Sequence, residues 1–194
     1  MIIKMFIAKA KRRLPMTAKE CIKGRRSIRK FKSTPVDHAL MNEIIETASY
    51  APSWKHSQIA RYTAVEGELK DKIAGECTEM FPNNGAIIEN APMLIALSFV
   101  KGRSGYERDG SFTTAKGDRW QMFDAGVAAE AFCLAAYDKG LGSVIMGIFD
   151  EAKAASLLEL PENQELAALI PVGFPDEEPS APRRKAVEDL LTYK

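Results

Sequence analysis

Apolar residues recur every three or four positions along several stretches of the chain, a spacing that places them on one face of an α-helix. The clearest set is Leu40, Met41, Ile44, Ile45 and Ala48. Pro35 precedes this set, and proline suits the first turn of a helix, so we expect a helix over residues 36–48. Further helices are expected over residues 17–23, 69–81, 118–139, 151–158 and 186–191.

The longest of these ranges, 118–139, is apolar on almost every side. Glu130 is the only charged residue between Ala125 and Tyr137, and alanines recur there together with Gly126. A helix that is apolar all round is buried, so we expect this one to be the central helix. Its small residues leave room for a neighbouring backbone to approach closely. That neighbour could belong to the same chain or to a second subunit. Glu130 is interpreted as a paired or rim carboxylate.

Four shorter stretches rich in aliphatic residues are expected to form strands, over residues 59–65, 93–100, 143–146 and 165–172. The run 93–100 is almost continuously apolar, which is typical of a strand buried on both faces. Asn83-Asn84-Gly85 predicts a break after the helix at 69–81.

Residues 101–117 show neither the three-to-four-residue spacing of a helix nor an apolar run typical of a strand. They contain four glycines among charges, with Tyr106 and Phe112 inserted. A loop of this length is usually functional or disordered. We expect a mobile flap over a site, with disorder as the alternative.

The composition is that of a soluble globular protein, with 46% hydrophobic and 27% charged residues in 194. No apolar run approaches the roughly 18 residues of a membrane span, and no signal peptide is evident. Three widely spaced cysteines argue against a disulfide framework or a zinc site and favour a reducing cytoplasm. With only two histidines, a His-rich metal site is excluded, and His38 is interpreted as a surface or capping residue.

Positive charge is concentrated at the start of the chain. Residues 1–32 hold 12 Lys or Arg and a single acid, Glu20, although the whole chain has a net charge of only +1. This asymmetry predicts a small anionic ligand near the N-terminal end rather than a nucleic acid. We expect one domain over residues 16–194 and a basic extension over residues 1–15, with Met16 as an alternative start.

Four stretches carry candidate chemistry: 25–29, 52–58, 146–148 and 183–185. In the first, Arg25, Ser27 and Arg29 alternate, so an extended segment projects them to one side, and arginine grips phosphate through paired hydrogen bonds. The first and last stretches are basic and would serve one phosphate. Gly147 lets backbone approach a planar ligand closely. No glycine-rich dinucleotide or ATP motif occurs.

Taken together, these stretches resemble the nitroreductase family of FMN enzymes. The matching motifs, in the family's order, are Gly-Arg-Arg-Ser-Ile-Arg-Lys-Phe at 24–31, Ala-Pro-Ser-x-x-x-x-Gln at 51–58, Lys-Gly-Leu-Gly at 139–142, Pro-Val-Gly-Phe-Pro at 171–175 and Pro-Arg-Arg-Lys at 182–185. The resemblance implies an α+β fold, an α/β/α sandwich with a central, mainly antiparallel mixed sheet around a long buried helix. It also implies a homodimer with FMN at the subunit interface.

The same resemblance implies the residues that would bind FMN: Arg25, Arg26, Ser27, Arg29, Arg183, Arg184 and Lys185 around the phosphate and pyrimidine side, Met146, Gly147 and Ile148 along the flavin, and Pro52, Ser53, Trp54 and His56 from the partner subunit. Arg26 would contribute mainly through its backbone.

The chain departs from the family's pattern at two points in the 51–60 region. His56 stands where the family usually has Asn, and Ile59-Ala60 stands where Pro-Trp usually follows Gln58. The imidazole of His56 either interacts with the flavin or points away. Trp54 and Lys55 would reshape the pocket.

The resemblance implies an NAD(P)H-dependent oxidoreductase that passes hydride through flavin N5 to a nitroaromatic, quinone or similar acceptor in a ping-pong cycle. No side chain acts as a nucleophile and no metal is needed, so no catalytic residue is assigned. Tyr106 and Phe112 are expected to bind the acceptor. The NADH or NADPH preference stays open, as do two alternatives: reductive dehalogenation or flavin fragmentation on the same fold, and non-catalytic flavin binding or storage.

Overall fold

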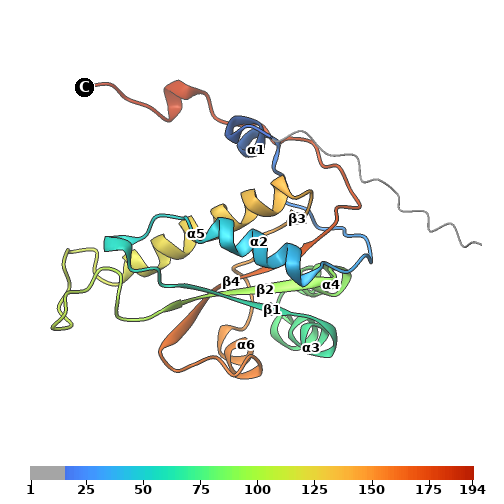
Figure 1. Cartoon of the computed structure of the whole chain (residues 1–194), viewed down its shortest axis with the longest axis horizontal. Coiled ribbons are helices and arrows are strands. Elements are labelled where there is room, and N and C mark those ends of the chain that lie inside the picture. The colour runs from blue at the N-terminus through green and yellow to red at the C-terminus, as the bar shows by residue number, and fades with distance from the viewer. Residues whose placement is uncertain (1–15) are drawn as a thin grey trace, which may run out of the picture.

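A four-stranded antiparallel sheet forms the centre of the computed structural model, which describes residues 16–194 (Figure 1). Its strand order is β1 (Ala60–Val65), β2 (Met93–Val100), β4 (Gln164–Gly173) and β3 (Gly142–Ser143). Strands β2 and β4 are central and almost wholly buried, as the apolar runs predict. The described residues contain one parallel pairing, an isolated bridge between Ser27 and Ser143.

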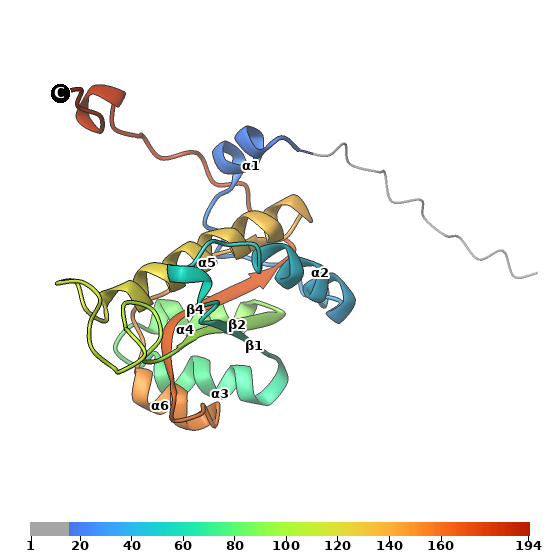
Figure 2. The same cartoon turned by 60° about the vertical axis from the view of Figure 1, so that its left-hand side comes forward.

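Helices cover both faces of this sheet (Figures 1 and 2). Side chains alternate along β2, so Met93, Ile95 and Leu97 pack against α2 (His38–Ala48) and α5 (Arg119–Asp138). Leu94 and Ala96 point to the opposite face, where α3 (Gly67–Cys77), α4 (Pro82–Asn90) and α6 (Glu151–Leu157) lie. The α+β sandwich is therefore confirmed.

Helix starts follow the capping residues in the sequence. Thr17 and Glu20 form a reciprocal capping box at α1 (Ala18–Gly24), and Asp150 caps α6. Asp37, not His38, caps α2, because its carboxylate accepts the backbone N–H of Ala39. His38 is exposed and pairs with Glu66 at 2.7 Å, so its surface interpretation is confirmed and its capping role is wrong.

The predicted break at 83–85 is wrong, since these residues lie inside α4. Pro82 occupies the start of that helix, where its missing N–H costs no hydrogen bond. Gly85 is needed there for close packing, because an added Cβ would lie 2.8 Å from the backbone oxygen of Ala74 on α3. The preceding helix, α3, accordingly ends at Cys77.

Two other elements are shorter than predicted. The strand expected at 143–146 is the two-residue β3 followed by an isolated bridge between Met146 and Leu169. The helix expected at 186–191 is a single 3-10 turn, η2 (Val187–Asp189), on a tail that leads away from the body (Figure 1). A second 3-10 turn, η1 (Trp54–His56), follows α2.

In the described part of the chain, no helix combines the length and apolar character needed to cross a membrane. The predicted extension at 1–15 lies outside the described residues.

The central helix α5 is buried along most of its length, as predicted, but one side is exposed. Met122 and Phe123 are 48% and 60% exposed. Both residues lie before the stretch 125–137 on which the prediction of a buried central helix rested, and most of that stretch is buried.

Candidate functional site

The segment that follows α1 is anchored by its apolar residues, so its arginines remain near the surface. Ile28 and Phe31 are buried together with Ala91. The backbone N–H of Ile28 bonds to Ser143 O at 3.0 Å, and that of Phe31 bonds to Asn90 Oδ1 at 2.7 Å.

Polar side chains of this segment line a cavity of about 270 Å³ together with part of the C-terminal tail. Its lining residues are Arg25, Arg26, Ser27, Arg29, Pro179, Ser180, Pro182 and Arg184. Four guanidinium groups and no carboxylate line it, so the cavity is suited to an anion. The structure thus brings together the two basic stretches that the sequence assigned to one phosphate.

The side chain of Arg25 is held at the edge of this cavity with one unused donor. It is 23% exposed, and its Nε lies 3.7 Å from Glu130 Oε1, too far for a hydrogen bond. Nε is buried, and no acceptor within residues 16–194 is placed to take its proton. A buried donor without a partner is costly, so this atom fits an acceptor supplied by a ligand. Of the two interpretations of Glu130, paired or rim carboxylate, the ion pair with Arg25 confirms the paired one.

Arg26 has a local structural role besides lining the cavity. Its Nη1 donates to the carbonyl oxygens of Lys23 and Arg25, both at 2.7 Å, which satisfies acceptors at the C-terminal end of α1. In the tail, Arg184 reaches the cavity lining, whereas Arg183 and Lys185 are exposed and do not line it.

Residues 146–148 come three to five positions after Ser143, which pairs with Ser27. Met146 is only 5% exposed, and its N–H and C=O both bond to Leu169, so its side chain belongs to the core. Gly147 and Ile148 are exposed and line a separate cavity of about 380 Å³ with Met80 and Phe81.

The turn at residues 53–58 has an unusual backbone. Lys55, His56 and Gln58 have φ values of 45°, 57° and 49°, a region that L-residues rarely adopt. Ser53 Oγ accepts the N–H of Gln58 at 2.9 Å, and Gln58 Nε2 lies 2.6 Å from His56 Nε2. The imidazole of His56 is therefore engaged by its own turn and is exposed.

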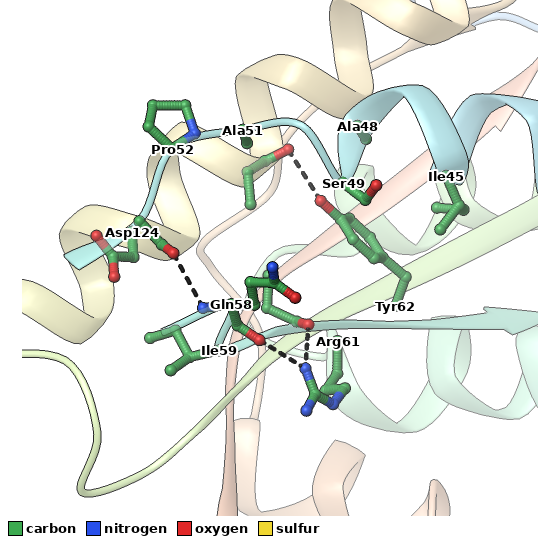
Figure 3. A pocket seen from close by; sticks show the side chains of 13 residues that line it. Ile45, Ala48, Ser49, Ala51, Pro52, Gln58, Ile59, Arg61, Tyr62 and Asp124 are labelled. Atoms are coloured by element: carbon green, nitrogen blue, oxygen red, sulfur yellow. Dashed lines mark hydrogen bonds between the residues drawn. The ribbon is translucent and has the colours of Figure 1, made fainter. Parts of the chain in front are cut away.

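A cavity of about 330 Å³ lies between this turn, α2, β1 and α5 (Figure 3). Pro52 and Ser53 line it, as does Arg61, whose Nη1 folds back onto the carbonyls of Gln58 and Ala60 at 2.9 and 2.8 Å. Tyr62 donates its hydroxyl proton to Ala128 O on α5 at 3.1 Å. Burial raises the pKa of Tyr62 to about 12.

Trp54 packs within the protein instead of lining that cavity. Its ring centroid lies 4.7 Å from that of Trp120 on α5. Its backbone N–H donates to Asp124 Oδ2 at 2.9 Å. The indole Nε1 is buried, and none of the described residues offers it an acceptor.

The loop at residues 101–117 folds on itself and lies beside this turn. Tyr106 and Phe112 form an isolated β-bridge with ring centroids 4.9 Å apart, and Phe112 is 57% exposed. Lys55 Nζ lies 2.9 Å from Glu107 Oε1. The hydrogen bond from Lys55 lowers the pKa of Glu107. The mobility of this loop stays a prediction.

Within one chain, the predicted cofactor residues that line these cavities therefore lie at three separate ones, and Trp54, His56, Met146, Arg183 and Lys185 line none of the three. The arginine cluster lies at one, Gly147 and Ile148 at a second, and Pro52 and Ser53 at a third. The sequence did not single out Asp124, a buried carboxylate on α5 that joins the 53–58 turn to the loop. Its only signal was an acid at the start of an apolar helical run.

Comparison with known proteins gives a consistent result. The model of the nitroreductase family matches residues 22–174. YfhC of Bacillus subtilis (strain 168) is 26% identical over 192 residues, covering 90% of this chain and 92% of that protein. The NADPH-flavin oxidoreductase of Vibrio harveyi is 28% identical, over 85% of this chain and 68% of that protein. The iodotyrosine deiodinase of Nematostella vectensis is 25% identical, over 89% and 73%.

Solved structures agree with these sequence relatives. A nitroreductase family protein from Clostridium novyi NT superposes with a TM-score of 0.71 at 31% identity, covering 84% of this chain and 87% of that one. An FMN-dependent nitroreductase from Clostridium difficile R20291 gives 0.68 at 26% identity, covering 85% and 91%. With its sandwich fold and a family match over most of its length, the chain belongs to the nitroreductase family.

Proposed function

We propose that this protein is an FMN-dependent oxidoreductase that carries hydride from NAD(P)H to a nitroaromatic, quinone or similar acceptor. Family membership supports the reaction class. The observation that carries the cofactor assignment is the cavity lined by Arg25, Arg26, Ser27, Arg29 and Arg184.

The residues of this cavity fit the phosphate of FMN. Paired N–H donors of arginine match phosphate oxygens in geometry and charge, and the buried Nε of Arg25 lacks an acceptor among residues 16–194. Two carboxylates lie close to this segment, and neither lines the cavity. Glu130 Oε1 is 3.7 Å from Arg25 Nε, and Glu177 accepts the backbone N–H groups of Arg29 and Lys30.

FMN, when bound, supplies the redox chemistry by accepting a hydride and passing it on. The chain's own residues bind and orient it. The arginines fix its phosphate, and their positive field favours negative charge nearby. Gly147, which has no side chain and is exposed, leaves open backbone for a planar ring to approach. Tyr106 and Phe112 present aromatic faces for an acceptor.

We further propose that the working form is a homodimer, with Pro52, Ser53, Trp54 and His56 contributed to the partner's cofactor. Two features support this. The cofactor residues of one chain surround separate cavities, so a single chain does not complete one site. Exposed apolar side chains, Met122 and Phe123 on α5 and Leu190 on the tail, remain to be covered.

Reductive dehalogenation is the second candidate, and the similarity to iodotyrosine deiodinase favours it specifically. The two activities would use the same FMN cavity. They differ in the acceptor, so assays with a nitroaromatic, a quinone and a halogenated phenol separate them.

The phosphate assignment is tested by comparing FMN with riboflavin, which lacks the phosphate. Titration of the apoprotein, followed by flavin fluorescence, should give a dissociation constant on the order of 100-fold lower for FMN, because several charge-assisted hydrogen bonds are lost with riboflavin. Arg25→Ala should weaken FMN binding on the order of tenfold or more and leave riboflavin binding unchanged.

Lys72→Ala, which removes an exposed cation on α3, is the matched control and should bind FMN as the parent does. Equal affinities for FMN and riboflavin would contradict the assignment of this cavity.

A further inference from the structure

Asp124 is a buried carboxylate with neutral hydrogen-bond donors around it. It is 5% exposed on α5. Its Oδ2 accepts the backbone N–H of Trp54 at 2.9 Å and the hydroxyl of Ser104 in a short hydrogen bond. Within residues 16–194, no cation forms an ion pair with it. A buried charge held only by donors of this kind is costly unless those donors are fixed in place.

The donors come from two segments that are far apart in sequence. Trp54 and Ser57 belong to the 53–58 turn, and Ser104 belongs to the 101–117 loop. Ser57 Oγ lies 2.8 Å from Ser104 Oγ and 3.4 Å from Asp124 Oδ2. Since Ser104 gives its only proton to Asp124, Ser57 donates to Ser104. Asp124 Oδ2 thus accepts hydrogen bonds from both segments.

Other contacts join the same two segments but are more exposed. The Lys55–Glu107 pair is 57% and 44% exposed, and exposed ion pairs hold a geometry weakly. Trp54 also contacts Trp120, with ring centroids 4.7 Å apart and planes tilted by 44°, but Trp120 lies on α5, so this contact does not join the turn to the loop. The buried network is therefore the main connection.

The turn has a particular need for such a connection. Three of its non-glycine residues, Lys55, His56 and Gln58, have positive φ values, and backbone in this region persists only where surrounding structure holds it. Asp124 accepts a hydrogen bond from Trp54, the residue immediately before Lys55, which is the first residue with positive φ.

We propose that Asp124 is a positioning residue that holds the 53–58 turn and the 101–117 loop in one fixed arrangement and so sets the geometry of the acceptor site. The inference rests on the proposed function for its effect on acceptors, because it takes Tyr106 and Phe112 as acceptor contacts. Its structural part does not depend on the reaction. Asp124 touches no reacting atom in this account.

The chain offers a direct optical readout. It contains two tryptophans, Trp54 and Trp120, whose rings are in contact. The indole signals in fluorescence and near-ultraviolet circular dichroism of the FMN-free protein therefore come from this pair alone. Asp124→Ala should weaken the circular dichroism of the pair and shift its emission to longer wavelength. Proteolytic cleavage within 101–117 should become faster by on the order of tenfold, since the loop loses one of its buried attachments to α5, although Gly102 N–H still bonds to Gln121 Oε1.

In the FMN-loaded enzyme, Asp124→Ala should raise the KM for the acceptor on the order of tenfold with a smaller change in kcat. Asp124→Asn retains an acceptor oxygen and should recover most of the parent's signal. Ser104→Ala, which removes the loop's bond to Asp124 but leaves the bond from Trp54, should raise acceptor KM without changing FMN affinity. Asp138→Asn, an exposed carboxylate on the same helix, is the matched control and should resemble the parent in every readout.

A folded Asp124→Ala variant with the parent's tryptophan signals, cleavage rate and acceptor KM would overturn the proposal. If that variant does not fold, Ser104→Ala decides, and a parent-like cleavage rate together with an unchanged acceptor KM would overturn it. If the protein reduces no acceptor, the proposed function fails, while the tryptophan and cleavage measurements on the FMN-free protein still test the role of Asp124.

Discussion

Glu107 shows how an exposed residue gains a preferred charge state from its neighbours. The hydrogen bond from Lys55 is the largest cause of its lowered pKa. A lowered pKa means that the folded state favours the carboxylate. Its contribution to stability is therefore present above the ordinary pKa of 4.5 and is lost as the pH falls through the folded value.

Glu107→Gln should therefore lower Tm slightly at pH 7, because the ion pair with Lys55 is exposed and solvent screens it. The difference from the parent should shrink as the pH falls below 4.5, where Glu107 takes up a proton and resembles glutamine. Scanning calorimetry across this range measures both values. A difference that grows toward acid would contradict the cause assigned to the pKa shift.

The sequence predicted the part of the candidate site that is defined by a concentration of positive charge. The arginines of the anion cavity are visible as a local excess of positive charge, and the structure brings Arg25 and Arg184 to one cavity as expected. Trp54 and Asp124 were not predictable in this way. Their roles depend on which distant segments meet at α5, and a single sequence does not contain that information.

At the scale of elements, the contact between α3 and α4 depends on one glycine. An added Cβ at Gly85 would lie 2.6 Å from Thr78 Oγ1 and 2.8 Å from Ala74 O. Gly75, on α3, has nothing within 4 Å of the same position. The two glycines are both helical and differ in their surroundings, so they form a matched pair.

Gly85→Ala should destabilise the protein by about 1–3 kcal/mol, because the helices must move apart to accommodate the methyl group. Gly75→Ala should stabilise it by about 0.5–1 kcal/mol, because alanine loses less backbone entropy in a helix. Urea denaturation monitored by circular dichroism measures both changes. A stabilising Gly85→Ala would show that α3 and α4 are not in close contact.

The same glycine explains why α4 was missed. Asn83-Asn84-Gly85 is a sequence typical of a turn, but the packing against α3 selects glycine there for space, and Pro82 starts the helix. The long helix and the central strands were predicted because they are long, continuously apolar stretches. An error of a residue or two at either end does not hide an element of that length. The lengths of strand β3 and of the tail turn were overestimated, because the extent of such short elements depends on contacts with distant parts of the chain.

At the scale of the whole molecule, the proposed shared cofactor site requires a second chain. The exposed side of α5 carries Met122 and Phe123, which suit a dimer contact. Phe123→Glu should convert the dimer to monomer and weaken FMN binding on the order of tenfold or more, because each site would lose the partner's contribution. Light scattering coupled to gel filtration measures the mass. A monomeric parent that binds FMN fully would contradict the shared site.

The most direct test of the central claim is the visible absorption spectrum of the purified protein, recorded anaerobically before and after NADH or NADPH is added. The account predicts flavin bands that bleach with a reduced nicotinamide and return when a nitroaromatic or quinone acceptor is added. Flavin bands that stay unchanged with both nucleotides, or a protein that cannot be reconstituted with FMN, would contradict it.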